Sequence, residues 1–143
     1  MKIVAIALPE MGHFIPVLHI AEELASRGHE VSVLTAEYGK EKCTPMIESA
    51  GCTAVFTQDG MDSVTLLPDE KKINNQTTDE RYQKFTPFLE NELSKLKPDI
   101  AVIDFFTVSG LDACDNLSIP VVVNYPLPLL LAGFMNYWPD SKC

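Results

Sequence analysis

The feature that most constrains the fold of this chain is a series of short apolar runs, separated by segments in which apolar residues recur at helical spacing. Two of these runs, residues 3–8 and 100–103, contain only aliphatic side chains. Such unbroken runs are typical of strands that are buried on both faces, as in the centre of a parallel sheet. Because the runs alternate with helical segments, the sequence predicts βαβ units and a parallel α/β fold.

Five strands and four helices are expected along the chain. The strands are predicted at residues 2–8, 31–35, 53–56, 99–104 and 119–123. The helices are predicted at residues 16–27, 38–50, 80–96 and 107–117. Pro16 suits the first position of a helix, and Gly28 and Gly51 suit the position that follows one. Residues 9–14 and the polar stretch 57–79 are expected to be loops.

Right-handed crossovers between these elements predict a doubly wound, Rossmann-like sheet with strand order 3-2-1-4-5. In that order the first and fourth strands are neighbours, and ligands bind beyond their carboxyl ends. His13 lies in the predicted loop after the first strand, and Asp104 ends the fourth. Neighbouring strands run about 4.8 Å apart, so the two side chains are expected to meet.

A histidine beside an aspartate suggests general base chemistry. An imidazole ordinarily titrates near neutral pH, at about 6.5, and a carboxylate behind it fixes its tautomer and stabilises the imidazolium. Such a pair suits the deprotonation of a hydroxyl group. The alternative is that His13 caps the start of a helix while Asp104 belongs to the start of the next one, and position alone leaves both interpretations open.

Several function classes are disfavoured by composition and motifs. The chain carries 11 Lys and Arg against 20 Asp and Glu, a net charge of −9, whereas nucleic-acid binding needs a basic surface. The four cysteines form no CxxC pair, so neither a zinc site nor a redox motif is predicted. Residues 9–16 contain one glycine and one glutamate instead of GxGxxG, which disfavours a dinucleotide site.

The apolar segments are too short to indicate secretion or a membrane span. The first run stops at Pro9, which is shorter than the apolar region of a signal peptide. The stretch 121–134 is interrupted by prolines and falls short of the roughly 20 residues that a bilayer requires. The sequence therefore predicts a cytoplasmic protein with no membrane span.

Five stretches together resemble one known family. They read GHFIP at residues 12–16, AEELA at 21–25, RGHEV at 27–31, PDIAVIDFF at 98–106 and IPVV at 119–122. In this order and spacing they are similar to the UDP-glycosyltransferase family, of glycosyltransferase family 1 type with the GT-B fold. The resemblance covers most of the chain and corresponds to the N-terminal, acceptor-binding half of that fold.

The resemblance implies roles for named residues. His13 corresponds to the general base that takes a proton from an acceptor hydroxyl, and Asp104 to the carboxylate that supports it. The acceptor then attacks the anomeric carbon of a UDP-sugar with inversion, and no metal or other cofactor is required. Neighbouring residues would line an apolar acceptor site or belong equally well to the core: Met11, Gly12, Phe14, Phe105 and Phe106.

Residues 1–143 are interpreted as a single, truncated acceptor-binding domain, because the family's C-terminal donor-binding domain is absent. The chain would then be a fragment of a glycosyltransferase that is inactive alone, or a subunit that works with a donor-domain partner chain. Its apolar C-terminal segment would dock that partner or a second copy of itself. A third hypothesis is a non-catalytic module that binds a small apolar ligand. Neither the acceptor nor the sugar is assigned by the sequence.

Overall fold

The computed structural model describes residues 1–57 and 78–125, which form a five-stranded parallel sheet. Its strands are β1 (Lys2–Ile6), β2 (Glu30–Ala36), β3 (Thr53–Thr57), β4 (Ile100–Asp104) and β5 (Val121–Asn124). They lie in the order β3-β2-β1-β4-β5, and each neighbouring pair is parallel. The predicted doubly wound α/β fold and its strand order are therefore confirmed.

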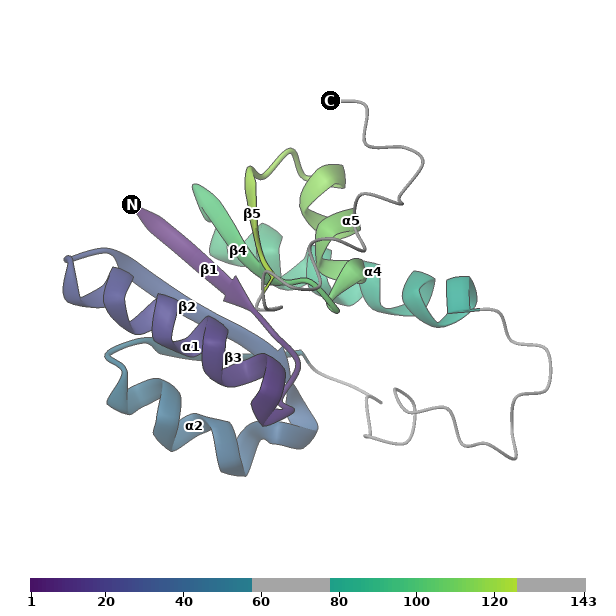
Figure 1. Ribbon diagram of the computed structural model, residues 1–143. Helices are drawn as coiled ribbons and strands as arrows, with labels where there is room; N and C mark the ends of the chain where they lie inside the picture. Colours follow the sequence, from purple (N-terminus) through teal and green to yellow (C-terminus); the bar gives the residue numbers. More distant parts are fainter. Residues whose placement is uncertain (58–77, 126–143) are drawn as a thin grey trace, which may run out of the picture.

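Helices cover both faces of the sheet (Figure 1). They are α1 (Met11–Ser26), α2 (Lys40–Ser49), α4 (Thr78–Leu96) and α5 (Val108–Asn116), and a short 3-10 turn, η1 (Glu37–Gly39), precedes α2. As predicted, Gly28 and Gly51 follow helices with positive φ angles of 87° and 71°. Glycine adopts the left-handed backbone conformation at this position without steric strain, because it has no Cβ.

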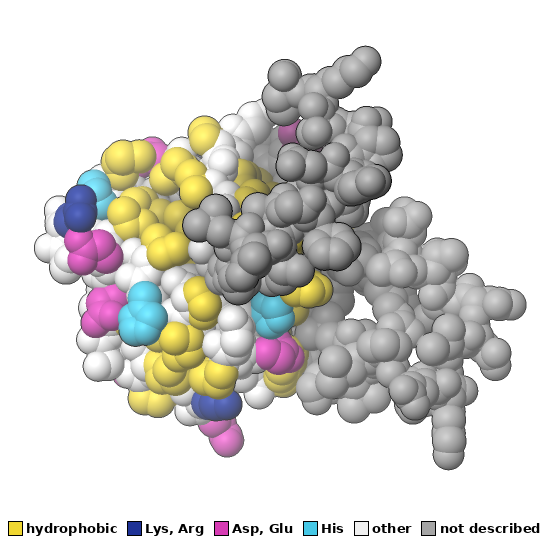
Figure 2. Space-filling view, in the orientation of Figure 1, with side chains coloured by type: hydrophobic (Ala, Val, Ile, Leu, Met, Phe, Trp, Pro, Cys, Tyr) yellow, Lys and Arg dark blue, Asp and Glu magenta, His cyan; other side chains and the backbone are white. Residues whose placement is uncertain are grey.

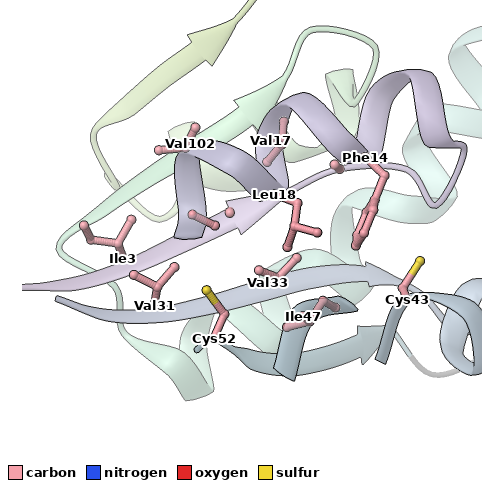
Figure 3. Packing of buried hydrophobic residues seen from close by; sticks show 13 residues of the cluster. Ile3, Phe14, Val17, Leu18, Val31, Val33, Cys43, Ile47, Cys52 and Val102 are labelled. Atoms are coloured by element: carbon pink, nitrogen blue, oxygen red, sulfur yellow. The ribbon is translucent and has the colours of Figure 1, made fainter. Parts of the chain in front are cut away.

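Two hydrophobic clusters, one on each face, hold these layers together. Figure 3 shows the first, where Phe14, Val17 and Leu18 of α1 pack towards β2, and Cys43 and Ile47 come from α2. The second cluster joins the other face of the sheet to α4 and α5. Strand β1 contributes alternate residues to both clusters, so it is the central strand buried on both faces that its aliphatic run predicted.

The prediction for the start of α1 was wrong. Helix α1 begins at Met11, five residues before Pro16, so residues 9–14 are not simply a loop and Pro16 lies inside the helix. Proline lacks the N–H that would bond to the carbonyl of Gly12. Phe14, which the extra turn carries into the core, is completely buried, and its burial offsets that lost hydrogen bond. The consequence is that His13 projects from the first turn of a helix.

Other boundaries differ less from the predictions. The predicted helix 38–50 begins with η1 and continues as α2, with Pro45 inside it. Most of the predicted polar loop, residues 57–79, lies outside the described residues, as does most of the apolar C-terminal segment. Within the described part of the chain, no helix is both long enough and apolar enough to cross a membrane.

The start of α1 is fixed against η1 by a close approach of two backbone segments. Gly39 is buried, and a Cβ added there would overlap the Pro9 ring and lie 3.3 Å from the Cys43 Sγ. Only glycine leaves room for the proline at this point. The chain after β2 therefore packs directly against the residues that lead from β1 into α1.

Candidate active site

His13 and Asp104 lie side by side at the carboxyl edge of the sheet, as their positions after neighbouring strands predicted. His13 is the third residue of α1, and its backbone N–H donates to the Glu10 carbonyl over 2.9 Å. Its Nδ1 lies 3.3 Å from Asp104 Oδ1 and 3.2 Å from Oδ2. The His13 side chain is 28% exposed and the Asp104 side chain is 0% exposed. The pair thus joins a partly accessible imidazole to a fully buried carboxylate.

The contacts of Asp104 favour one tautomer of the imidazole. An ionised carboxylate only accepts hydrogen bonds, so Nδ1 of His13 carries the proton that faces it. The lone pair of the neutral ring is then on Nε2, which is the arrangement of a general base backed by an acid. Because Asp104 also accepts the backbone N–H of Phe106 at Oδ2 over 3.2 Å, its buried charge is compensated from two sides.

The alternative, purely structural interpretation of the pair has partial support. Asp104 holds the turn before α5, since its carboxylate binds the Phe106 N–H and its carbonyl accepts the N–H of Thr107 over 2.9 Å. His13, however, does not cap α1, because the residue at the cap position is Glu10 and no side chain there bonds to the helix. Asp104 therefore fixes the turn and the imidazole together.

Aromatic side chains surround the imidazole. The Phe106 ring meets His13 edge-on with ring centroids 4.6 Å apart, and Phe105 lies 4.2 Å from Phe106. Tyr125, which sequence reasoning missed, packs against Phe105 at 4.6 Å. Its position just after the fifth strand could have indicated it, because the carboxyl ends of neighbouring parallel strands meet at one edge. Phe106 and Tyr125 are exposed, so this cluster offers an aromatic surface next to the base.

The remaining predicted acceptor residues differ in what they offer. Phe14 is 0% exposed and packs in the core under α1, so its prediction as an acceptor-lining residue is corrected in favour of the core alternative. Met11 is partly buried against the same cluster. Gly12 is exposed, and nothing lies within 4 Å of the place where its Cβ would be. Of this group only Gly12, Phe105 and Phe106 combine proximity to His13 with open surface or ring contact.

A second polar pair, also missed by sequence reasoning, lies at the start of the helix that carries His13. The Tyr38 hydroxyl donates to Glu10 Oε1 over 2.7 Å. Burial, followed by this hydrogen bond and the negative charge of Glu10, raises the pKa of Tyr38 above its ordinary value. Nothing in the local sequence signals a contact between residues 28 positions apart. The bond ties η1 to the first turn of α1, which carries His13.

The described residues were also compared with the requirements of a metal site. Residues 1–57 and 78–125 contain no group of three or more His, Cys, Asp or Glu side chains that could hold a metal ion. A surface hollow of about 440 Å³ lies at the opposite edge of the sheet, between the end of α4 and the start of β5. On the face shown in Figure 2, hydrophobic side chains form patches between scattered acidic and histidine side chains.

Comparison with known proteins connects the chain to glycosyltransferases. No protein-family model matches it. It is 30% identical over 129 residues to UDP-glycosyltransferase 82A1 of Arabidopsis thaliana, covering 88% of this chain and 27% of that protein. It is also 30% identical over 131 residues to UDP-glycosyltransferase 73E1 of Stevia rebaudiana, covering 81% of this chain and 26% of that protein. The predicted resemblance is confirmed, and the chain spans about a quarter of the length of these relatives.

Solved structures of glycosyltransferases share the fold. UGT89C1 of Arabidopsis thaliana, in complex with UDP-L-rhamnose, has a TM-score of 0.68 at 16% identity, covering 99% of this chain and 40% of that one. SnogD of Streptomyces nogalater has a TM-score of 0.65 at 20% identity, covering 87% of this chain and 35% of that one. The predicted fold class, a doubly wound half of a GT-B fold, is confirmed by these likenesses.

Proposed function

We propose that this chain is the acceptor-binding domain of an inverting, UDP-sugar-dependent glycosyltransferase, and that His13 is its general base. The observation that carries the proposal is the contact between His13 Nδ1 and the buried carboxylate of Asp104, at 3.2 Å. It lies at the edge of the sheet where doubly wound folds bind their ligands. The similarity to named UDP-glycosyltransferases supplies the reaction class.

The proposed reaction transfers one proton and one glycosyl group. His13 Nε2 removes the proton from an acceptor hydroxyl while the hydroxyl oxygen attacks the anomeric carbon of the sugar. The bond from that carbon to the UDP oxygen breaks, UDP leaves with the electron pair, and the anomeric configuration inverts. Asp104 stabilises the imidazolium that forms, and it keeps the ring oriented throughout.

The aromatic surface beside the base supports an apolar acceptor. Phe105 and Phe106 lie within ring contact of each other and of His13, and Phe106 presents about half of its surface. Pockets for small molecules are usually lined by such side chains with a few placed polar groups. We assign the UDP-sugar mainly to a donor-binding domain that is not part of these 143 residues.

A chimeric enzyme tests the proposal. The chain replaces the matching region of UDP-glycosyltransferase 82A1, and UDP release is measured with UDP-sugars and a panel of phenols. Replacing His13 with alanine is expected to lower kcat about 10²- to 10⁴-fold, the usual contribution of a general base. The matched control is His19→Ala, on the exposed side of the same helix, where Nδ1 contacts Glu22 over 3.4 Å.

The control variant is expected to keep its activity, because His19 is far more exposed than His13 and its Nδ1 contacts Glu22 instead of Asp104. Asp104→Asn should also lower kcat, since the amide removes the charge that stabilises the imidazolium. Transfer that persists undiminished in His13→Ala would disprove the general-base assignment. Circular dichroism of each variant checks that the fold is intact.

A further inference from the structure

Asn124, the last residue of β5, occupies the position next to Asp104 in the sheet. The two residues are register partners in the parallel pairing of β4 with β5. Residues in register on neighbouring strands point to the same face. On β4 that face is the one packed on α1, because Val102, two residues before Asp104, belongs to the α1 cluster. Asn124 is therefore aligned with Asp104, on the side of the sheet from which His13 approaches.

The Asn124 side chain carries an unsatisfied donor. Its Nδ2 is buried and has no hydrogen-bond partner among the described residues, 1–57 and 78–125. Leaving a buried amide donor unpaired is unfavourable, and such groups in folded proteins call for an explanation such as a bound ligand or water. The backbone carbonyl of the same residue does have a partner, since it accepts the Phe105 N–H over 3.2 Å. The group without a partner among the described residues is the side-chain Nδ2.

Among the described residues, helix α1 makes its main contacts with β2, β1 and β4, and β5 lies beyond them at the edge of the sheet. Val122, which precedes Asn124 on the same face of β5, is 52% exposed. The next residue after Asn124 is Tyr125, an exposed ring in contact with Phe105. A ligand that reaches the base could thus extend over β5, with the aromatic cluster as its floor.

We propose that Asn124 Nδ2 donates a hydrogen bond to a second oxygen of the acceptor, next to the hydroxyl that His13 deprotonates. This inference rests on the proposed function and names the acceptor class. The acceptor is a hydroxylated aromatic ring that bears another hydroxyl or carbonyl oxygen beside the reacting one. The aromatic cluster of Phe105, Phe106 and Tyr125 selects the ring, and the amide of Asn124 selects the neighbouring oxygen.

Two probes and one spectrum test the inference on the 143-residue chain. Catechol has two adjacent hydroxyl groups, and phenol is the matched probe with one. Each is titrated into the ¹⁵N-labelled chain, in which the Asn124 side-chain amide gives its own pair of signals, assigned by their loss in Asn124→Leu. Catechol is expected to shift this pair together with the backbone amides of His13 and Phe106. Phenol is expected to shift the backbone amides only.

The variant Asn124→Leu gives a second readout. Leucine has a similar shape without the donor, so it is expected to fold at least as well as the parent. Catechol affinity should fall about fivefold to tenfold, the effect of one neutral hydrogen bond, and phenol affinity should stay within about twofold. Equal weakening of both probes would overturn the inference.

The outcomes separate this inference from the function on which it rests. If catechol shifts the His13 and Phe106 amides but leaves the Asn124 pair unmoved, the acceptor site stands and the role of Asn124 is overturned. If neither probe moves the amides around His13, the proposed acceptor site itself is contradicted, and the inference falls with it.

Discussion

Phe14 and Phe106 flank the dyad in sequence, and they should respond in opposite ways to the same substitution. Phe14 is 0% exposed in the α1 cluster, whereas Phe106 is 52% exposed. Phe14→Ala removes a fully buried ring and leaves a closed cavity, so the free energy of unfolding should fall by about 3–5 kcal/mol. Only about half of the Phe106 ring is buried, so Phe106→Ala should lower the free energy of unfolding by about 1 kcal/mol.

Urea denaturation followed by circular dichroism measures both losses. If Phe14→Ala proves too unstable to fold, Phe14→Leu keeps most of the buried volume, and it should still lose more stability than Phe106→Ala. In the chimeric enzyme Phe106→Ala should raise the acceptor KM, because its ring contacts His13 at 4.6 Å. Equal losses of stability at the two positions would refute the assignment of Phe14 to the core and of Phe106 to the surface.

The remaining predictions concern two glycines near the start of α1 and one buried thiol in α5. Gly39→Ala should lower the free energy of unfolding by about 1–3 kcal/mol, because its Cβ overlaps the Pro9 ring. Gly12→Ala, where the space is open, should be neutral or stabilising by up to about 1 kcal/mol, and equal thermal shifts would contradict this. Burial raises the pKa of Cys114 from 9.0 to about 11, so the folded chain keeps this thiol proton longer than the unfolded chain does. The contribution of this thiol to the free energy of unfolding is therefore complete below pH 9. It is lost as the pH rises towards 11, and the free energy of unfolding falls by up to about 1.4 kcal/mol per pH unit in this range. Urea titrations at several pH values give the free energy of unfolding as a function of pH. Between pH 9 and 11 this free energy should fall less steeply in Cys114→Ala than in the parent, and an equally steep fall would contradict the role of the Cys114 thiol.

The strand order was predictable because it depends on long-range hydrophobic patterning. The aliphatic side chains of β1 and β4 are buried on both faces only if these strands lie in the middle of a sheet. Right-handed crossovers then make the two strands neighbours. That adjacency alone brought His13 and Asp104 together. The contact is one of sheet topology, so it did not depend on the exact start of α1, which the sequence placed five residues too late.

The side-chain roles were less predictable, for three physical reasons. Pockets and cores use the same residue types, so Phe14 was indistinguishable from Phe106 until its burial was known. The bond between Glu10 and Tyr38 depends on how η1 folds back, and no local motif encodes that geometry. Asn124 drew attention only because it is in register with Asp104. The predicted fifth strand ended one residue before Asn124, so the sequence did not reveal this pairing.

His13 and Asp104 are 91 positions apart in the chain, and they meet only when β4 pairs with β1. During synthesis, β1, β2 and β3 with their helices emerge well before β4 is available to insert beside β1. Contacts of such long sequence separation are slow to form, because the entropy of closing the intervening chain must be overcome first. The imidazole signals of His13 should therefore change late in refolding, and they would report the step in which β4 pairs with β1.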